Sequence, residues 1–188
     1  MNRKLFYEAI RKPLFGIKKV KQTQVDGIEA LLNATDHLTD PRHRAYILAT
    51  AYHETAKIMQ PVEEYGKGKG FDYGRMVKRN RKPYAFPDKL FYGRGLVQLT
   101  WYENYEYMGR ILGLDLLNHP ELALQMDISC RIIVTGMTRG MFTGVKLDTY
   151  FNDDREDWEQ ARKIVNGTDC AEKVAGYARI FHRALTEL

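Results

Sequence analysis

Apolar residues recur at intervals of three and four along most of the chain, which is the spacing of helices that bury one face. Asp40 and Pro41 have the form of an N-cap followed by a proline in the first helical turn, and an apolar stripe continues from them to Pro61. Thr23 and Asp127 are further candidate N-caps. The pattern predicts helices over 3–11, from 23, over 41–60, from 120, from 127, over 154–165 and over 170–186.

The middle of the chain departs from this spacing. Residues 66–82 open with three glycines in five positions, which disfavours a stable helix and predicts a loop or a short irregular hairpin. Residues 91–105 combine aromatic side chains with glycines. Because the sequence shows no internal repeat and no linker, we expect one mainly helical domain over residues 1–188, with a cleft lined by residues 54–105.

The composition is 44% hydrophobic and 28% charged over 188 residues, which is typical of a folded globular domain and excludes wholesale disorder. The net charge of +5 suggests an anionic partner, and the surplus lies in residues 66–82, where seven basic residues face Asp72 alone. Residues 67–82 are therefore either a solvated charged loop or a basic edge that contacts an anionic cell envelope. Because Phe71 and Tyr73 lie among the basic residues, a nucleic-acid-binding module is an alternative of another class.

The two cysteines, Cys130 and Cys170, are too few for a disulfide framework. They predict either two reduced thiols in a cytoplasmic protein or a single pair. No apolar run approaches the ~20 residues that span a bilayer, so we expect no stable membrane insertion. Charged residues interrupt the first segment too early for a signal peptide, and synthesis in the cytoplasm is expected.

Acidic residues at two positions are candidates for acid–base chemistry. Glu54 follows an apolar stripe, where desolvation favours the protonated form of a carboxyl group and suits a general acid. Glu63 and Glu64 follow Pro61 in a more solvated loop, where a carboxylate stays ionised and can act as a base. Two carboxyl groups in unlike settings are what glycoside hydrolysis requires. The alternative interpretation is that these residues are solvated surface carboxylates with no chemical role, because such residues occur at the same spacing in many helical proteins.

Metal binding is not indicated by the histidines. His53 precedes Glu54, but the zinc motif that begins in this way needs a second histidine where the chain has Lys57, so we expect neither a metal nor a cofactor. Sugar binding is indicated by flat aromatic faces beside amide and hydroxyl groups, although some of these aromatic residues are expected in the core. The residues of this kind are Tyr92, Trp101, Gln98, Thr100 and Asn104.

Four segments, taken in order, resemble glycoside hydrolase family 19, which includes plant class I and II chitinases and many bacteriophage endolysins. The segments are Ala51-Tyr52-His53-Glu54-Thr55, Met59-Gln60-Pro61-Val62-Glu63-Glu64-Tyr65-Gly66, Tyr92-Gly93-Arg94-Gly95-Leu96-Val97-Gln98-Leu99-Thr100-Trp101 and Ile164-Val165-Asn166-Gly167. The resemblance runs over residues 4–184 and is nearest to the phage and prophage endolysin branch. It implies a lysozyme-like, two-lobed helical fold with a central cleft, and an inverting mechanism with its carboxyl groups roughly 6.5–9.5 Å apart.

The resemblance also implies roles for individual residues. Glu54 matches the general acid, the general base falls at Glu63 or Glu64, and Thr100 matches the residue that helps to hold the attacking water. Gln98, Asn104 and Asn166 match residues that line the cleft, and Lys173 falls where plant members carry a basic residue. Together with Tyr92, Trp101 and His53, these form the predicted substrate-binding set.

The sequence lacks the cysteines that staple secreted chitinases, and this favours the endolysin branch. We expect a monomeric endolysin of lysozyme type that cleaves β-1,4 bonds between N-acetylmuramic acid and N-acetylglucosamine in peptidoglycan. Host-cell lysis would follow its release through the membrane by another factor. A chitinase that cleaves β-1,4-linked N-acetylglucosamine polymers is the alternative, and no nucleic acid partner is expected.

Overall fold

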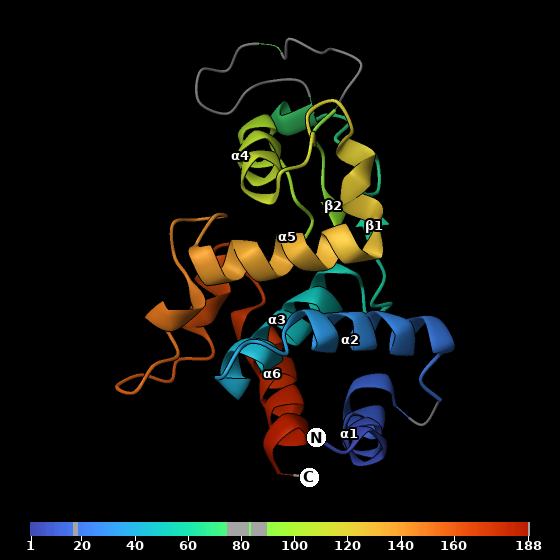
Figure 1. Cartoon of the computed structure of the whole chain (residues 1–188), viewed down its shortest axis with the longest axis vertical. Coiled ribbons are helices and arrows are strands. Elements are labelled where there is room, and N and C mark those ends of the chain that lie inside the picture. The colour runs from blue at the N-terminus through green and yellow to red at the C-terminus, as the bar shows by residue number, and fades with distance from the viewer. Residues whose placement is uncertain (17–18, 75–82, 84–89, 188) are drawn as a thin grey trace.

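The computed structural model describes residues 1–16, 19–74, 83 and 90–187 (Figure 1). The helices of these residues are α1 (Arg3–Ile10), α2 (Gln22–Ala34), α3 (Pro41–Glu54), α4 (Tyr102–Leu112), α5 (Met126–Arg139) and α6 (Ala171–Thr186). A π-helical turn over Arg11–Phe15 continues α1, and short 3₁₀ helices occupy Asp72–Gly74, Pro120–Leu124, Leu147–Thr149 and Gln160–Ile164. Strands β1 (Val62–Glu63) and β2 (Arg94–Gly95) pair antiparallel, with Val62 opposite Gly95 and Glu63 opposite Arg94.

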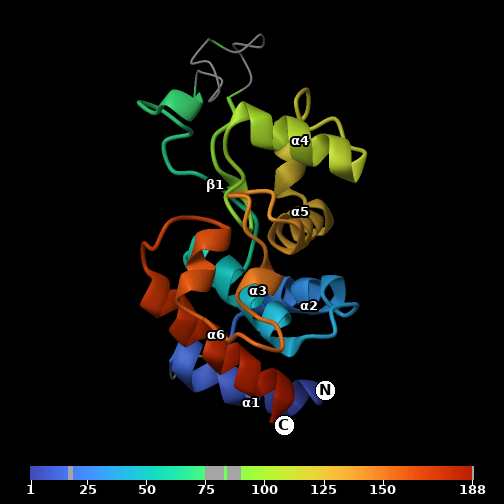
Figure 2. The same ribbon diagram turned by 90° about the vertical axis from the view of Figure 1, so that its left-hand side faces the viewer.

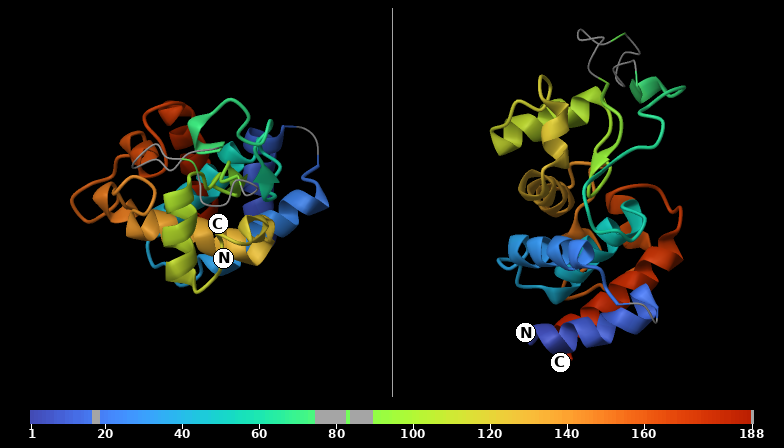
Figure 3. Two further views of the ribbon diagram at one scale, coloured as in Figure 1. Left: turned by 90° about the horizontal axis from the view of Figure 1, so that it is seen from above. Right: turned by 90° about the vertical axis from the view of Figure 1, so that its right-hand side faces the viewer.

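The helices form two lobes, which confirms the predicted mainly helical, two-lobed architecture. One lobe holds α1, α2, α3 and α6, the other holds α4 and the strands, and α5 runs between them (Figures 1 and 2). Helix α3 packs along α6 within the first lobe, and α2 of that lobe packs on α5. Both termini lie at the end of the first lobe, as the views of Figure 3 also show.

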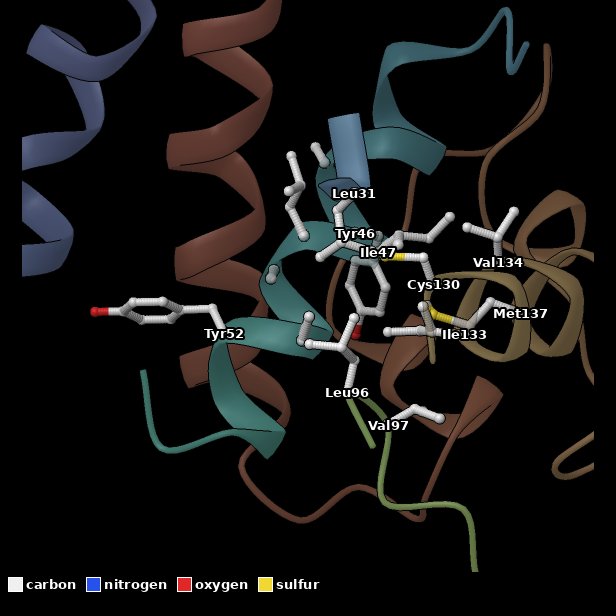
Figure 4. Packing of buried hydrophobic residues seen from close by; sticks show 14 of the residues in the cluster. Leu31, Tyr46, Ile47, Tyr52, Leu96, Val97, Cys130, Ile133, Val134 and Met137 are labelled. Carbon is white, nitrogen blue, oxygen red and sulfur yellow. The ribbon is translucent and has the colours of Figure 1, made fainter. Parts of the chain in front are cut away.

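The core is centred on α3, in which every residue from Ala45 to Tyr52 is buried. A helix that is buried all round has no face of polar residues turned to solvent, and it needs neighbouring elements on every side. Those neighbours are α2, α5, α6 and the chain beside β2. Figure 4 shows side chains from α2, α5 and the chain after β2 around those of α3. The labelled core residues there include Leu31, Tyr46, Ile47, Leu96, Ile133 and Met137.

Helix α3 ends at Glu54, so the prediction that it continues to Pro61 is wrong. The Thr55 hydroxyl donates to the Ala51 carbonyl and accepts from the Met59 amide, which closes the helix and folds the chain back. Ala56, Lys57 and Met59 take positive φ angles in this turn, a conformation that costs free energy for residues other than glycine. The turn is held because it packs directly on α2, so the helix end depends on tertiary contact.

Other boundaries also differ from the sequence pattern. Helix α2 begins at Gln22, where the Lys21 amide donates to the Gln24 side chain, so Thr23 is not the cap. Helix α5 is preceded by Gln125, and Asp127 lies in its first turn. The segments predicted as helices at 120 and 154–165 contain only 3₁₀ turns, and α4 was not predicted. Residues 66–74 form turns, and the rest of the predicted 66–82 loop lies outside the described residues.

The two thiols are unpaired: Cys130 is buried in α5 and Cys170 is exposed just before α6. Burial raises the pKa of the Cys130 thiol to about 12, so this side chain packs as a neutral group. Among the described residues, no helix is both long enough and apolar enough to cross a membrane.

Candidate active site

The carboxylate of Glu54, the last residue of α3, is held by a buried arginine. Arg162 donates from Nη1 to Glu54 Oε1 at 2.7 Å, and from Nε to the Asp169 carbonyl at 3.0 Å. The side chain of Arg162 is 3% exposed and that of Glu54 is 17% exposed. A pair this enclosed is fixed in direction, because neither partner can turn away without losing its charged bond. Glu54 is therefore a positioned carboxyl group at the rim of the core.

Sequence reasoning missed Arg162, although a signal for it exists. It lies between the buried Ala161 and Ile164, just before the Asn166-Gly167 pair. A charged residue within a buried run requires a partner of opposite charge. The pattern could therefore indicate a buried ion pair, but not that Glu54, 108 positions earlier, is the partner.

The neighbouring Glu63 and Glu64 have separate sets of partners. Glu63 accepts from the Tyr92 hydroxyl at 2.5 Å and pairs with Lys67 at 3.1 Å, and Arg94 Nε lies 3.9 Å away. The Tyr92 hydrogen bond and the nearby cations hold the pKa of Glu63 below its usual range. Successive residues of a strand point to opposite faces, which explains why the two carboxylates diverge.

Glu64 is oriented toward the aromatic and amide groups that follow β2. It accepts from the Tyr73 hydroxyl and, at 2.9 Å, from the Gly93 amide. Gly93 lies between Glu64 and Gln98: a Cβ on it would lie 2.7 Å from Gln98 Oε1 and 3.3 Å from Glu64 Oε2. The absence of a side chain at Gly93 is thus what brings Glu64 up to Gln98.

A cleft of about 680 Å³ opens between the end of α3 and the segments that contain Gln98 and Asn166. Six predicted site residues line it: Glu54, Gln98, Thr100, Trp101, Asn104 and Asn166. Its lining also contains eight residues outside the predicted set: Val97, Leu99, Phe142, Thr143, Val145, Lys163, Val165 and Gly167. The structure therefore brings together one candidate acid, the candidate water-holding threonine and most of the predicted sugar-binding groups.

The cleft wall after β2 is rigid and strained. Gln98 and Trp101 have φ angles of 54° and 75°, values that favour glycine. Gln98 Nε2 donates to the carbonyls of Val62 and Gly95, at 3.0 and 3.2 Å, and the Thr100 hydroxyl donates to the Gln98 carbonyl at 2.9 Å. With its proton engaged, the Thr100 oxygen is left as an acceptor, which suits a group that holds a water molecule.

The other predicted site residues do not line the cleft within the part of the chain that the structure describes. Tyr92 is 6% exposed, and the guanidinium of Arg94 lies 3.6 Å from its ring centroid, so it holds Glu63 and does not offer a sugar platform. His53 lies beside Glu54, and its pKa is lowered by burial. Lys173 lines a separate hollow near the start of α6, within charge range of His53.

Comparison with known proteins places these motifs in one family. The family model described as chitinase class I (Glyco_hydro_19) matches residues 13–135. Endochitinase CH5B of Phaseolus vulgaris is 33% identical over 102 residues, which cover 48% of this chain and 29% of that protein. The matched region is therefore less than a third of that relative's length.

Two solved structures share the fold. A bacterial family 19 chitinase matches with a TM-score of 0.61 at 19% identity, over 98% of this chain and 94% of that one. Chitinase C from Streptomyces griseus HUT6037 matches with a TM-score of 0.64 at 17% identity, over 98% of this chain and 76% of that one. These matches extend the similarity of fold over almost the whole chain.

Proposed function

The chain belongs to glycoside hydrolase family 19, the chitinase class I family, and we propose that it hydrolyses a polymer of β-1,4-linked N-acetyl sugars. The observation that carries this proposal is the placement of Glu54 and Thr100 in one cleft, with Glu64 bonded to Gly93 and close to Gln98 of the cleft wall. A cleft with a carboxyl group at its rim, a second one close to its wall, and amide, hydroxyl and indole groups along that wall matches the chemistry of a sugar chain.

In the proposed reaction, Glu54 is the general acid. Its protonated carboxyl group donates from Oε2 to the glycosidic oxygen, while Arg162 holds Oε1 and stabilises the carboxylate that forms as the proton leaves. A water molecule held by the Thr100 hydroxyl oxygen attacks the anomeric carbon from the opposite face and gives its proton to the general base. The products are two shorter glycans, one of which carries a new reducing end.

We assign the general base to Glu64. Among the described residues, its two hydrogen-bond donors are the uncharged Tyr73 hydroxyl and Gly93 amide, which orient the carboxylate without an ion pair. It is also adjacent to Gln98, which lines the cleft. Glu63 is the second candidate because its depressed pKa keeps it ionised, but its charge is already paired with Lys67.

Peptidoglycan is the proposed substrate, with chitin as the alternative that the names of the relatives favour. Lys163 supports peptidoglycan because it places an exposed cation in the cleft lining. The peptide stems of peptidoglycan carry carboxylates that a lysine can attract, whereas chitin carries no charge. The proposed role is that of an endolysin, which reaches the wall after release through the membrane by another factor. The unpaired, exposed Cys170 is consistent with synthesis in a reducing compartment.

Product analysis tests the reaction and the assignments together. Purified peptidoglycan and chitin oligosaccharides are digested, and new reducing ends are counted and identified by mass spectrometry. We expect reducing ends from peptidoglycan, a loss of about 10²–10⁴-fold in turnover for Glu54→Gln and Glu64→Gln, and a much smaller loss for Glu63→Gln. New amino groups without new reducing ends would contradict glycosidase activity, and full activity of Glu64→Gln would move the base to Glu63.

A further variant separates the substrates. Lys163→Gln should lower kcat/KM on peptidoglycan and leave turnover of neutral chitin oligosaccharides unchanged, because only the former carries stem carboxylates. An equal loss on both substrates would contradict the charge argument. Expression in bacterial cytoplasm with and without a pore-forming release factor tests the endolysin role, with lysis expected only when the factor is present.

A further inference from the structure

A second concentration of positive charge lies outside the cleft lining, on α1 and the residues that lead into α2. Over residues 1–16 and 19–21, six basic residues face the single acid Glu8; they are Arg3, Lys4, Arg11, Lys12, Lys19 and Lys21. This segment occupies the end of the first lobe that is furthest from α4 (Figures 1 and 2). The charge of the chain is thus not confined to residues 66–82.

Helix α1 is strongly two-sided. It buries Phe6 and Ile10 and packs against α6. Its exposed side carries Lys4, Leu5, Glu8 and, one turn on, Arg11 and Lys12, all of which are exposed. Leu5 is 38% exposed in the middle of this charged surface. Arg3 is not counted with this exposed charged surface, because its guanidinium pairs with Glu29 of α2 at 3.0 Å.

An apolar groove of about 300 Å³ runs between α1 and the chain that enters α2. Tyr7, Val20 and Val25 supply its apolar groups, and the three cations Lys4, Arg11 and Lys19 line it together with one acid, Glu8. The Tyr7 hydroxyl donates to Glu29 at 2.9 Å, so it is turned toward α2 and the ring remains as an apolar surface. Burial and the Glu29 carboxylate raise the pKa of Tyr7, which therefore stays neutral.

We propose that this surface, made of Lys4, Leu5, Arg11, Lys12 and Lys19, binds the face of an anionic phospholipid bilayer. Lysine and arginine gain electrostatic free energy at lipid phosphates, and an exposed leucine beside an apolar groove gains by entering the interfacial region. A hydrophilic polyanion would use only the cations. Binding in this way leaves the cleft unobstructed, because the surface lies at the end of the first lobe (Figure 2) and none of its residues lines the cleft.

Vesicle co-sedimentation tests the proposal on the full chain. Vesicles of phosphatidylglycerol and phosphatidylcholine, vesicles of phosphatidylcholine alone, and soluble heparin serve as three probes at fixed ionic strength. The test variant is Lys4→Gln/Arg11→Gln/Lys19→Gln. The control, Arg110→Gln/Arg139→Gln/Lys146→Gln, removes the same charge from exposed positions elsewhere. Glycan turnover and circular dichroism report folding in both triple variants.

The expected result is binding to the anionic vesicles, weak binding to neutral ones, and about a hundredfold loss in the test variant. This magnitude follows from about fivefold for each basic residue at an anionic surface. The control should keep most of its vesicle affinity, and Leu5→Ser should weaken vesicle binding but not heparin binding. Equal losses in both triple variants, or a Leu5→Ser variant that binds vesicles like the parent chain, would overturn the proposal. In the latter case the surface would be one for soluble polyanions.

Discussion

The Glu54–Arg162 pair offers a direct measure of how much one enclosed contact contributes to the site. Arg162→Met removes the guanidinium and keeps most of the buried volume. Deleting one partner of a buried ion pair costs about 3–5 kcal/mol. Because Glu54 remains 17% exposed and water can reach it, we expect the lower end of this range. A loss of about 3 kcal/mol corresponds to a fall in Tm of about 6–12 °C for a chain of this size.

Urea unfolding at neutral pH, followed by tryptophan fluorescence, gives the free energy of unfolding for each variant. A cycle with Glu54→Gln and the double variant isolates the pairwise contribution, for which we expect a coupling of about 1–3 kcal/mol. Arg155→Met is the matched control, since Arg155 pairs with Asp157 at 2.8 Å with side chains 45% and 31% exposed.

A surface pair of that kind contributes about 0–1 kcal/mol. Added salt should weaken the control pair more than the enclosed pair, because a Debye length of about 10 Å at 0.1 M screens exposed charges first. The reasoning is refuted if Arg162→Met costs no more than Arg155→Met, or if the cycle shows no coupling with Glu54.

Two further predictions concern the contacts that hold the site. Gly27→Ala would place a Cβ 1.7 Å from the carbonyl oxygen of Met59 and should lower the free energy of unfolding by about 3 kcal/mol or more. The control Gly176→Ala meets nothing within 4 Å and should raise the free energy of unfolding by about 0.5–1 kcal/mol. Equal Tm shifts in the two variants would contradict the close packing of α2 on the turn after α3. Tyr92→Phe removes the hydrogen bond that lowers the pKa of Glu63. A depressed carboxyl pKa stabilises the fold at neutral pH and ceases to do so as the pH falls through the folded-state value. The difference in free energy of unfolding between Tyr92→Phe and the parent chain should therefore decrease as the pH is lowered. A difference that stays constant from neutral to acid pH would refute the role of Tyr92 in lowering the pKa of Glu63.

The sequence predicted which types of residue line the cleft, but not which individual side chains face it. The block around Gln98, Thr100, Trp101 and Asn104 combines the groups that a sugar chain needs, and the structure places all four in one wall. The same kind of reasoning also placed Tyr92 with the sugar-binding residues. Its side chain is instead covered by Arg94 and bonded to Glu63, and it does not line the cleft.

The sequence by itself determined the helical class, the start of α3 at Asp40-Pro41 and the span of α6, because capping and apolar spacing are local properties. Tertiary structure decided where α3 stops, since the turn after Glu54 holds three positive φ angles only against α2. It also decided that Arg162, 108 positions away in the sequence, is the cation that binds Glu54. The separation of Glu63 from Glu64 is likewise tertiary, because both are acidic neighbours and only the pairing of β1 with β2 gives them different partners.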